Sequence, residues 1–204
     1  MKTRERIIYK AIDLLNEKGI PNVSMREIAD ALDMSVGNVT YYFPRWNDLM
    51  EELNHQMMLE ISHLPRIPFD LSDLHSVFER VPMVQEKYGF ITRDIHLFIS
   101  HYPEFARLRK TLVGSRIEDM INQLSVWAQQ GICHEDSSDH NHKRIAVKMW
   151  LFLASWSVQD TLLRETEYAL SKEEFLAIIW QIFTPHFTPL GMEKFKEIKE
   201  RAQF

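Results

Sequence analysis

The stretch that decides the fold runs from Ser24 to Phe43 and reads SMREIADALDMSVGNVTYYF. Ser24 followed three residues later by Glu27 is a capping box, a pattern that marks a helix start because it satisfies backbone N–H groups that lack helical partners. Apolar residues then recur at helical spacing, at Ile28, Ala29 and Leu32. The first part of the stretch therefore predicts a short helix with one buried face.

A second short helix is predicted after a tight turn, with Ser35 at its start. One of its faces carries Val36, Val39, Thr40 and Phe43, which we expect to be the packed side. The opposite face carries Gly37, Asn38, Tyr41 and Tyr42. Two short helices joined in this way form a helix-turn-helix, and small, polar and aromatic groups on its exposed face suit base edges and phosphates in a DNA major groove.

Length and composition are those of a globular protein with one larger and one smaller domain. The chain has 204 residues, of which 45% are hydrophobic and 26% charged. A single cysteine, Cys133, excludes an intrachain disulfide. The first residues lack the apolar core of a signal peptide, and no stretch is apolar enough to span a membrane. We therefore expect a cytoplasmic protein with no membrane association.

The net charge of −5 is unusual for a protein that binds nucleic acid, but the acidity lies outside the predicted helix-turn-helix. Residues 1–47 hold seven Lys/Arg against six Asp/Glu and are close to neutral. Affinity for DNA depends on local phosphate contacts rather than on global charge. The distribution predicts modest affinity for each monomer.

Helical periodicity accounts for almost the whole chain, and no strand pattern competes with it. We predict an all-α protein with an N-terminal three-helix domain at 1–47, a linking helix at about 47–63 and a larger helical domain at 64–204. Pro82 predicts a kink or break in its helix, and the tail helix is expected to be solvent-exposed. The predicted helices outside the central stretch cover residues 3–18, 44–63, 70–88, 90–101, 103–131, 143–164, 171–186 and 190–202.

Residues 1–60 resemble the TetR/AcrR family of bacterial transcriptional regulators. The resemblance rests on Ile28-Ala29, on the pattern from Ser35 through Gly37 to Tyr41-Tyr42-Phe43, and on Asp48-Leu49. It implies a helix-turn-helix DNA-binding domain followed by a helical domain that binds ligands and dimerises. It also implies a ligand-responsive homodimer, most often a repressor, that reads a near-palindromic operator in double-stranded DNA and is released by a small-molecule effector.

The resemblance also implies roles for individual residues. Arg26 and the start of the second short helix correspond to groove contacts, Gly37 and Asn38 to base-reading positions, and Tyr42 to a phosphate contact. Three positions depart from the family pattern. Thr40 stands where a tyrosine is common, and Asp33 stands where the turn usually has a glycine. Trp46 stands where a lysine is common, and the neighbouring Arg45 could substitute for that lysine. The full candidate DNA-binding set is Ser24, Arg26, Ser35, Gly37, Asn38, Thr40, Tyr41, Tyr42 and Arg45.

The two predicted helices at 143–164 and 171–186 are apolar on more than one face. A helix of this kind must be buried on more than one side, either in a large intrachain core or against a second subunit. Dimeric recognition requires two reading helices roughly 34 Å apart, which favours the second subunit. The predicted interface residues are Trp150, Leu153, Trp156, Ile179, Trp180 and Phe183.

Ligand-binding residues are the least constrained by the sequence. Aromatic and methionine side chains on the middle helices, with a few polar groups, are typical either of an apolar pocket or of an ordinary core. The effector would act by favouring the form whose reading helices no longer match the groove spacing. The candidate pocket residues are Met83, Phe90, His96, Phe98, Met120, Gln123 and Trp127.

Two further hypotheses concern other functions. The loop from Cys133 to His142 concentrates thiol, imidazole and carboxylate groups, so a metal-responsive regulator is an alternative to a plain solvated loop. The missing lysine and weak basic charge favour a second alternative, an adaptor that has lost specific DNA binding. No phosphate-binding glycine loop or catalytic motif is present in the sequence, so we predict neither an enzyme nor a bound cofactor or metal.

Overall fold

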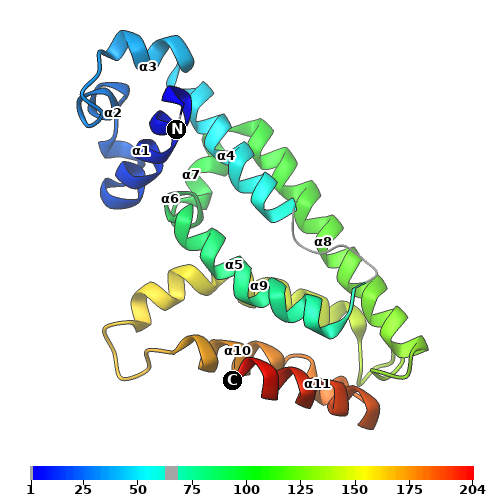
Figure 1. The fold of residues 1–204 in the computed structure, drawn as a ribbon. Coiled ribbons are helices and arrows are strands. Elements are labelled where there is room, and N and C mark those ends of the chain that lie inside the picture. Colours follow the sequence, from blue (N-terminus) through cyan, green and yellow to red (C-terminus); the bar gives the residue numbers. More distant parts are fainter. Residues whose placement is uncertain (1, 63–68) are drawn as a thin grey trace. The chain divides into compact units, whose positions relative to one another are not determined.

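The computed structural model describes residues 2–62 and 69–204, and Figure 1 follows their helices in chain order. Within these residues every regular element is helical, apart from one isolated antiparallel bridge between Cys133 and Phe187. No helix of this described part is long and apolar enough to cross a membrane. The elements are α1 (Thr3–Lys18), η1 (Ile20–Asn22), α2 (Met25–Asp30), α3 (Val36–Tyr42), α4 (Trp46–Ser62), α5 (Leu71–Lys87), α6 (Gly89–Arg93), α7 (Ile95–His101), α8 (Pro103–Gln129), α9 (His142–Leu163), α10 (Lys172–Trp180), η2 (Thr184–His186) and α11 (Pro189–Ala202).

The helices form two compact units, and the division differs from the single boundary predicted from the sequence. The N-terminal unit comprises Met1–His63 together with Val84–Ala106, and the C-terminal unit comprises Leu64–Met83 together with Arg107–Phe204. Helices α5 and α8 therefore each contribute residues to both units. The predicted end of the linking helix near residue 63 lies outside the described residues.

The core of the N-terminal unit joins α1 to α4 with the segment after residue 84. Ile7 and Leu15 of α1 and Leu49 of α4 are fully buried, and Phe90 and Phe98 from α6 and α7 belong to the same cluster. Helix α1 ends at Lys18, and the next residue, Gly19, has a φ of 78°, a positive value that glycine adopts without steric cost. Long-range packing, rather than local sequence, thus draws residues 84–106 into this unit.

Aromatic side chains dominate the core of the C-terminal unit. Trp127 of α8, Phe78 of α5 and Trp180 of α10 are almost fully buried in one cluster. Helix α11 packs into it through Phe195 and Ile198, so the prediction that the tail helix is solvent-exposed is wrong. The same contact is tight at Gly191, where a Cβ atom would clash with the carbonyl oxygen of Ile132.

Three predicted helices end or continue differently from the sequence prediction. The segment 90–101 divides at Asp94 into α6 and α7, and the segment 171–186 divides into α10 and η2. Helix α5, in contrast, continues through Pro82, although proline lacks the N–H that would bond to the preceding turn.

Candidate nucleic-acid interface and ligand pocket

Helix α2 begins with the predicted capping box. The Ser24 Oγ accepts a hydrogen bond from the Glu27 N–H at 3.3 Å, and Glu27 Oε2 accepts one from the Ser24 N–H at 2.9 Å. Desolvation raises the pKa of the Glu27 carboxyl, but the hydrogen bonds from Ser24 and Lys18 together with the charge of Lys18 outweigh it, so the pKa is lowered. Ser24 and Glu27 thus fix the start of the first helix of the motif, and the exposed Arg26 lies within its first turn.

Helix α3 is capped by Ser35, whose Oγ accepts a hydrogen bond from the Asn38 N–H at 3.3 Å. Val39 and Phe43 are buried as predicted, whereas Val36 is exposed and does not belong to the packed face. On the outer face the ring of Tyr41, 80% exposed, meets the ring of Tyr42 edge-on at 5.1 Å between centroids. The exposed side of α3 therefore presents two tyrosines beside Gly37 and Asn38.

Gly37 has no packing reason of its own to be glycine. A Cβ atom there would lie 3.7 Å from the Ser35 Oγ, at ordinary contact distance, and its φ is not in the left-handed region. The missing side chain is therefore not required by the protein itself. It leaves the surface of α3 open to close approach by a partner.

The turn between α2 and α3 explains the departure at Asp33. Its φ of 53° lies in the left-handed region, which favours glycine but is tolerated by aspartate. The Met34 N–H donates to the Ala29 carbonyl at 3.0 Å and closes the turn. The turn thus keeps a glycine-like conformation without a glycine.

Two candidate contact residues are already engaged within the chain. The Thr40 hydroxyl donates to the carbonyls of Val36 and Gly37, at 3.1 and 3.3 Å. Arg45 forms a two-pronged ion pair with Asp48, with Nη2 to Oδ1 at 2.6 Å, and this hydrogen bond is the main cause of the lowered pKa of Asp48. Both side chains are at the surface, but their polar groups have partners.

The residues predicted for a dimer interface are largely inside one chain. Leu153, Ile179, Trp180 and Phe183 are buried in the core of the C-terminal unit, while Trp150 and Trp156 are half-buried. A side chain that its own chain covers has no area left for a second subunit. Apolar periodicity identified buried positions but did not show what buries them.

A different stripe of α9 is exposed. Leu151 and Leu162 are 61% and 67% exposed, and they lie on one helix face with half-buried or exposed apolar neighbours. The stripe is defined by Val147, Leu151, Ala154, Val158 and Leu162. We call it the α9 stripe.

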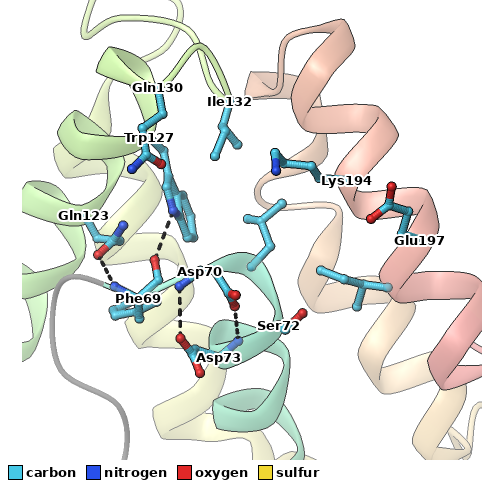
Figure 2. Close-up of a pocket in the computed structure, with 12 residues that line it drawn as sticks. Phe69, Asp70, Ser72, Asp73, Gln123, Trp127, Gln130, Ile132, Lys194 and Glu197 are labelled. Carbon is cyan, nitrogen blue, oxygen red and sulfur yellow. Dashed lines mark hydrogen bonds between the residues drawn. The ribbon is translucent and has the colours of Figure 1, made fainter.

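The residues predicted for a ligand pocket fall into both units and do not form one site. Phe90, His96 and Phe98 belong to the N-terminal unit, where the two phenylalanines are core residues and His96 is exposed. Met83 is exposed and Met120 buried in the C-terminal unit. Only Gln123 and Trp127 line the pocket of about 470 Å³ shown in Figure 2.

That pocket lies within the C-terminal unit, between the start of α5, the end of α8 and α11 (Figure 2). Gln123 is 1% exposed, and its Oε1 accepts a hydrogen bond from the Phe69 N–H at 2.9 Å. The Trp127 Nε1–H donates to the Phe69 carbonyl at 3.2 Å. These two bonds hold the chain just before α5 against α8 and form one wall.

Polar and charged groups supply much of the remaining lining, so this pocket is more polar than the predicted one, which was apolar with a few polar groups. Asp70 and Asp73 cap the start of α5 reciprocally, each accepting a hydrogen bond from the other's N–H, at 3.0 and 2.8 Å. Lys194 and Glu197 of α11 lie on the opposite side (Figure 2). The sequence analysis missed these residues because it treated α11 as an exposed tail.

The histidine-rich loop does not assemble a metal centre in the described part of the chain. Among these residues no group of three or more His, Cys, Asp or Glu side chains is placed to hold a metal ion. Cys133 is buried, its thiol donates to the Leu124 carbonyl at 3.1 Å, and burial raises its pKa to about 11. A protonated thiol is a poor metal ligand.

A capped helix-turn-helix with an exposed reading face, followed by a helical unit, defines a DNA-binding regulator by class. Comparison with known families gives the same result. Residues 7–53 match the model described as bacterial regulatory proteins, tetR family, and residues 50–195 match the TetR model described as bacterial transcriptional repressor. The chain therefore belongs to the TetR family of transcriptional regulators.

Individual relatives agree with this assignment. The chain is 42% identical over 53 residues to YttP of Bacillus subtilis, a probable HTH-type transcriptional regulator, and the match spans only 26% of either chain. A TetR-family regulator from Marinobacter aquaeolei VT8 superposes with a TM-score of 0.83 at 22% identity, covering 98% of each chain. SmeT, the repressor of the SmeDEF multidrug efflux pump of Stenotrophomonas maltophilia, does so with a TM-score of 0.66 at 13% identity, covering 93% of this chain and 92% of SmeT. At these identities the structural likenesses show the fold alone.

Proposed function

We propose that the protein is a cytoplasmic, homodimeric repressor that binds a near-palindromic operator and is released from it by a small molecule. The observation that carries the DNA-binding part is the outer face of α3, where Gly37 leaves space that the fold does not need. Beside it, Asn38 offers an amide to base edges, and Tyr42 offers a hydroxyl to a phosphate. Arg26 of α2 adds a charged contact in the same unit.

Dimerisation supplies the second half of the reading surface. A monomer has one short reading helix, and its residues 1–47 are almost neutral, so it makes few phosphate contacts and two copies are needed for useful affinity. The α9 stripe is an exposed apolar surface on the C-terminal unit. We assign the subunit contact to this stripe in place of the buried residues that the sequence analysis named.

The pocket between α5, α8 and α11 is our candidate effector site. Its volume of about 470 Å³ falls within the range of small-molecule sites. The lining charges comprise three carboxylates and one ammonium group, at Asp70, Asp73, Glu197 and Lys194. The expected effector is a small polar molecule, bound by hydrogen bonds rather than by an apolar cavity.

The decisive experiment is selection of bound DNA from a random duplex pool, with purified full-length protein, followed by sequencing. Enrichment of a near-palindrome of roughly 14–20 base pairs supports the dimeric operator-binding proposal. Tyr42→Ala and Arg26→Ala should weaken binding to the selected sequence in gel shifts. Unchanged affinity in both variants would overturn the assignment of the reading face.

A competing function is an adaptor that keeps the fold without specific DNA binding. The engaged hydroxyl of Thr40 and the ion pair of Arg45 with Asp48 favour it, because both reduce the groups available for backbone contacts. No enrichment from the pool at low salt, together with weak retention on heparin, would support the adaptor. Strong retention that declines steeply with salt would support DNA binding.

A further inference from the structure

Two histidines meet head-on on the surface of the C-terminal unit. His140, in the loop before α9, and His186, at the end of η2, have their Nδ1 atoms 3.0 Å apart. Their ring centroids are 5.2 Å apart, and the ring planes are almost perpendicular. The distance between the centroids is close to the sum of the Nδ1–Nδ1 distance and the distances of the two nitrogens from their own ring centres. The four points therefore lie almost on one line, and the two Nδ1 atoms point at one another.

This geometry has room for only one proton between the two Nδ1 atoms. A neutral imidazole has one N–H and one lone pair, so a single Nδ1–H between the rings gives an ordinary hydrogen bond. If both rings are protonated, two Nδ1–H groups face each other, neither can accept, and two positive charges repel at close range. The head-on approach also leaves no point on which both lone pairs converge, as a shared metal ion would require.

The surroundings make the second proton unfavourable. Burial lowers the pKa of His186, and the positive charges of His140, Lys148, His142 and His134 lower it further, in that order of effect. The ring of His134 stacks on that of His140 at 4.3 Å between centroids. Negative groups on the same loop are Glu135, Asp136 and Asp139.

The other polar contacts of the loop do not share this sensitivity. His142 Nε2–H donates to the His134 carbonyl at 3.0 Å, and its Nδ1 lies 3.4 Å from the Ser125 Oγ, so a protonated ring keeps both contacts. Two backbone hydrogen bonds hold the start of the loop in place. The His134 N–H donates to the His186 carbonyl, and the Thr188 N–H donates to the Ile132 carbonyl. Only the later part of the loop, which leads into the cap residue Asn141, depends on the histidine pair.

This later part of the loop orders the first turn of α9. Asn141 caps the helix by accepting from the Arg144 N–H at 2.9 Å, and Asp136 accepts from the His142 N–H at 2.9 Å. His140 directly precedes the cap residue. We propose that the His140–His186 contact is a pH-sensitive fastening of this loop, which opens when the second ring is protonated and thereby loosens the start of α9.

The test is hydrogen exchange of the full-length protein followed by mass spectrometry at pH 7.5 and pH 5.5, with rates corrected for the pH dependence of chemical exchange. Peptides covering 135–146 should exchange about tenfold faster at pH 5.5, as expected for the loss of one hydrogen bond of ordinary strength. Peptides from the middle of α8 report any general loss of stability at pH 5.5, and the increase in 135–146 is measured relative to them. Equal corrected rates in 135–146 at both pH values would overturn the proposal.

Variants separate the pair from its neighbours. His186→Asn retains polar atoms near the Nδ1 position but does not titrate, so His140 keeps a partner in either protonation state and the pH effect should disappear. His186→Ala removes the partner, so exchange should be fast at both pH values. His96→Asn, at an exposed site in the other unit, should behave as wild type. A pH effect that persists in His186→Asn would place the sensitive group elsewhere and contradict the proposal.

Discussion

The side-chain amide of Asn16 forms hydrogen bonds on both sides of the break between α5 and α6, with Lys87 and with Phe90. Asn16 Oδ1 accepts a hydrogen bond from the Phe90 N–H at 2.9 Å, and its Nδ2 donates to the Lys87 carbonyl at 2.9 Å. The Arg93 guanidinium donates to the Asn16 carbonyl at 2.9 Å. One residue of α1 thus satisfies main-chain groups more than seventy residues away in the sequence.

Replacement of Asn16 should therefore destabilise the N-terminal unit. Asn16→Ala leaves the Phe90 N–H and the Lys87 carbonyl without their partner, and we expect a loss of about 2 kcal/mol in the free energy of unfolding. Urea denaturation followed by circular dichroism measures this loss. Asn122→Ala, at an exposed position of α8, is the control and should have little effect. Equal stability of Asn16→Ala and wild type would show that water replaces these bonds at no cost.

Gly37→Ala should separate folding from DNA binding. The fold has room for the methyl group, and alanine favours a helix over glycine by up to about 1 kcal/mol, so the variant should be as stable as wild type or more stable. Its affinity for the selected operator should nevertheless fall, because the methyl group projects from the reading face. Gel shifts and thermal unfolding provide the two measurements.

The matched control for this substitution is Gly114→Ala in α8, where, beyond the chain neighbours and the nearby backbone of the helix itself, no atom lies within 4 Å of the added Cβ. It should raise stability to a similar degree and leave DNA affinity unchanged. An operator affinity of Gly37→Ala equal to that of wild type would mean that DNA does not approach α3 at this point.

A charge on the α9 stripe should prevent dimerisation. Leu151→Glu places a carboxylate at an exposed apolar position, and a two-fold interface would bury it twice. The dissociation constant of the dimer should rise at least about tenfold, as measured by sedimentation velocity over a range of concentrations. Lys196→Glu, exposed on α11, is the control and should leave the oligomeric state unchanged. A dimer of unaltered affinity in Leu151→Glu would assign the interface to another surface.

Acidification should lower stability through His75. Burial lowers the pKa of this histidine, with partial opposition from Glu79, and its Nδ1 accepts a hydrogen bond from the Trp180 Nε1–H at 3.3 Å. The unfolded chain takes up its proton first as the pH falls, near the ordinary value of 6.5. The stabilisation is therefore complete above pH 6.5 and declines between 6.5 and the lower pKa of the folded state.

The measurement is the free energy of unfolding by urea at pH 7.5 and 5.5, in wild type and in His75→Asn. The substitution preserves an acceptor for Trp180 but cannot titrate, so the difference between the two pH values should be smaller in the variant. A difference as large as that of wild type would assign the acid sensitivity to other groups, such as His186.

The helix-turn-helix was predictable because its determinants are local. The capping box at Ser24 and the cap at Ser35 form within three residues of sequence, and Val39 and Phe43 follow the helical period that burial requires. Val36 was wrongly assigned to the packed face, because it follows the helical period but lies at the exposed first turn of α3. The unusual Asp33 was recognised from the family pattern, and its left-handed φ supplies the physical reason.

Long-range packing was not predictable from one sequence. The apolar residues of the predicted helix 171–186 gave Trp180 and Phe183 as interface residues, but periodicity does not distinguish a face covered by another subunit from one covered by the same chain. Phe195 and Ile198 are three residues apart, a spacing typical of a buried helix face, and this signal in α11 was overlooked. The pocket beside α11 was missed for the same reason.

The N-terminal unit is built from two separate segments of the chain, and this limits where the protein can be cut into fragments. Its core draws Tyr88, Phe90 and Phe105 from beyond the segment that the C-terminal unit interposes. A fragment that stops at residue 63 would expose the surfaces these side chains cover, and a chimera with another regulator needs crossover points near residues 84 and 106 as well as 63. Recombination that transfers the DNA-binding unit of this protein to another regulator must therefore join the chains at three points rather than one.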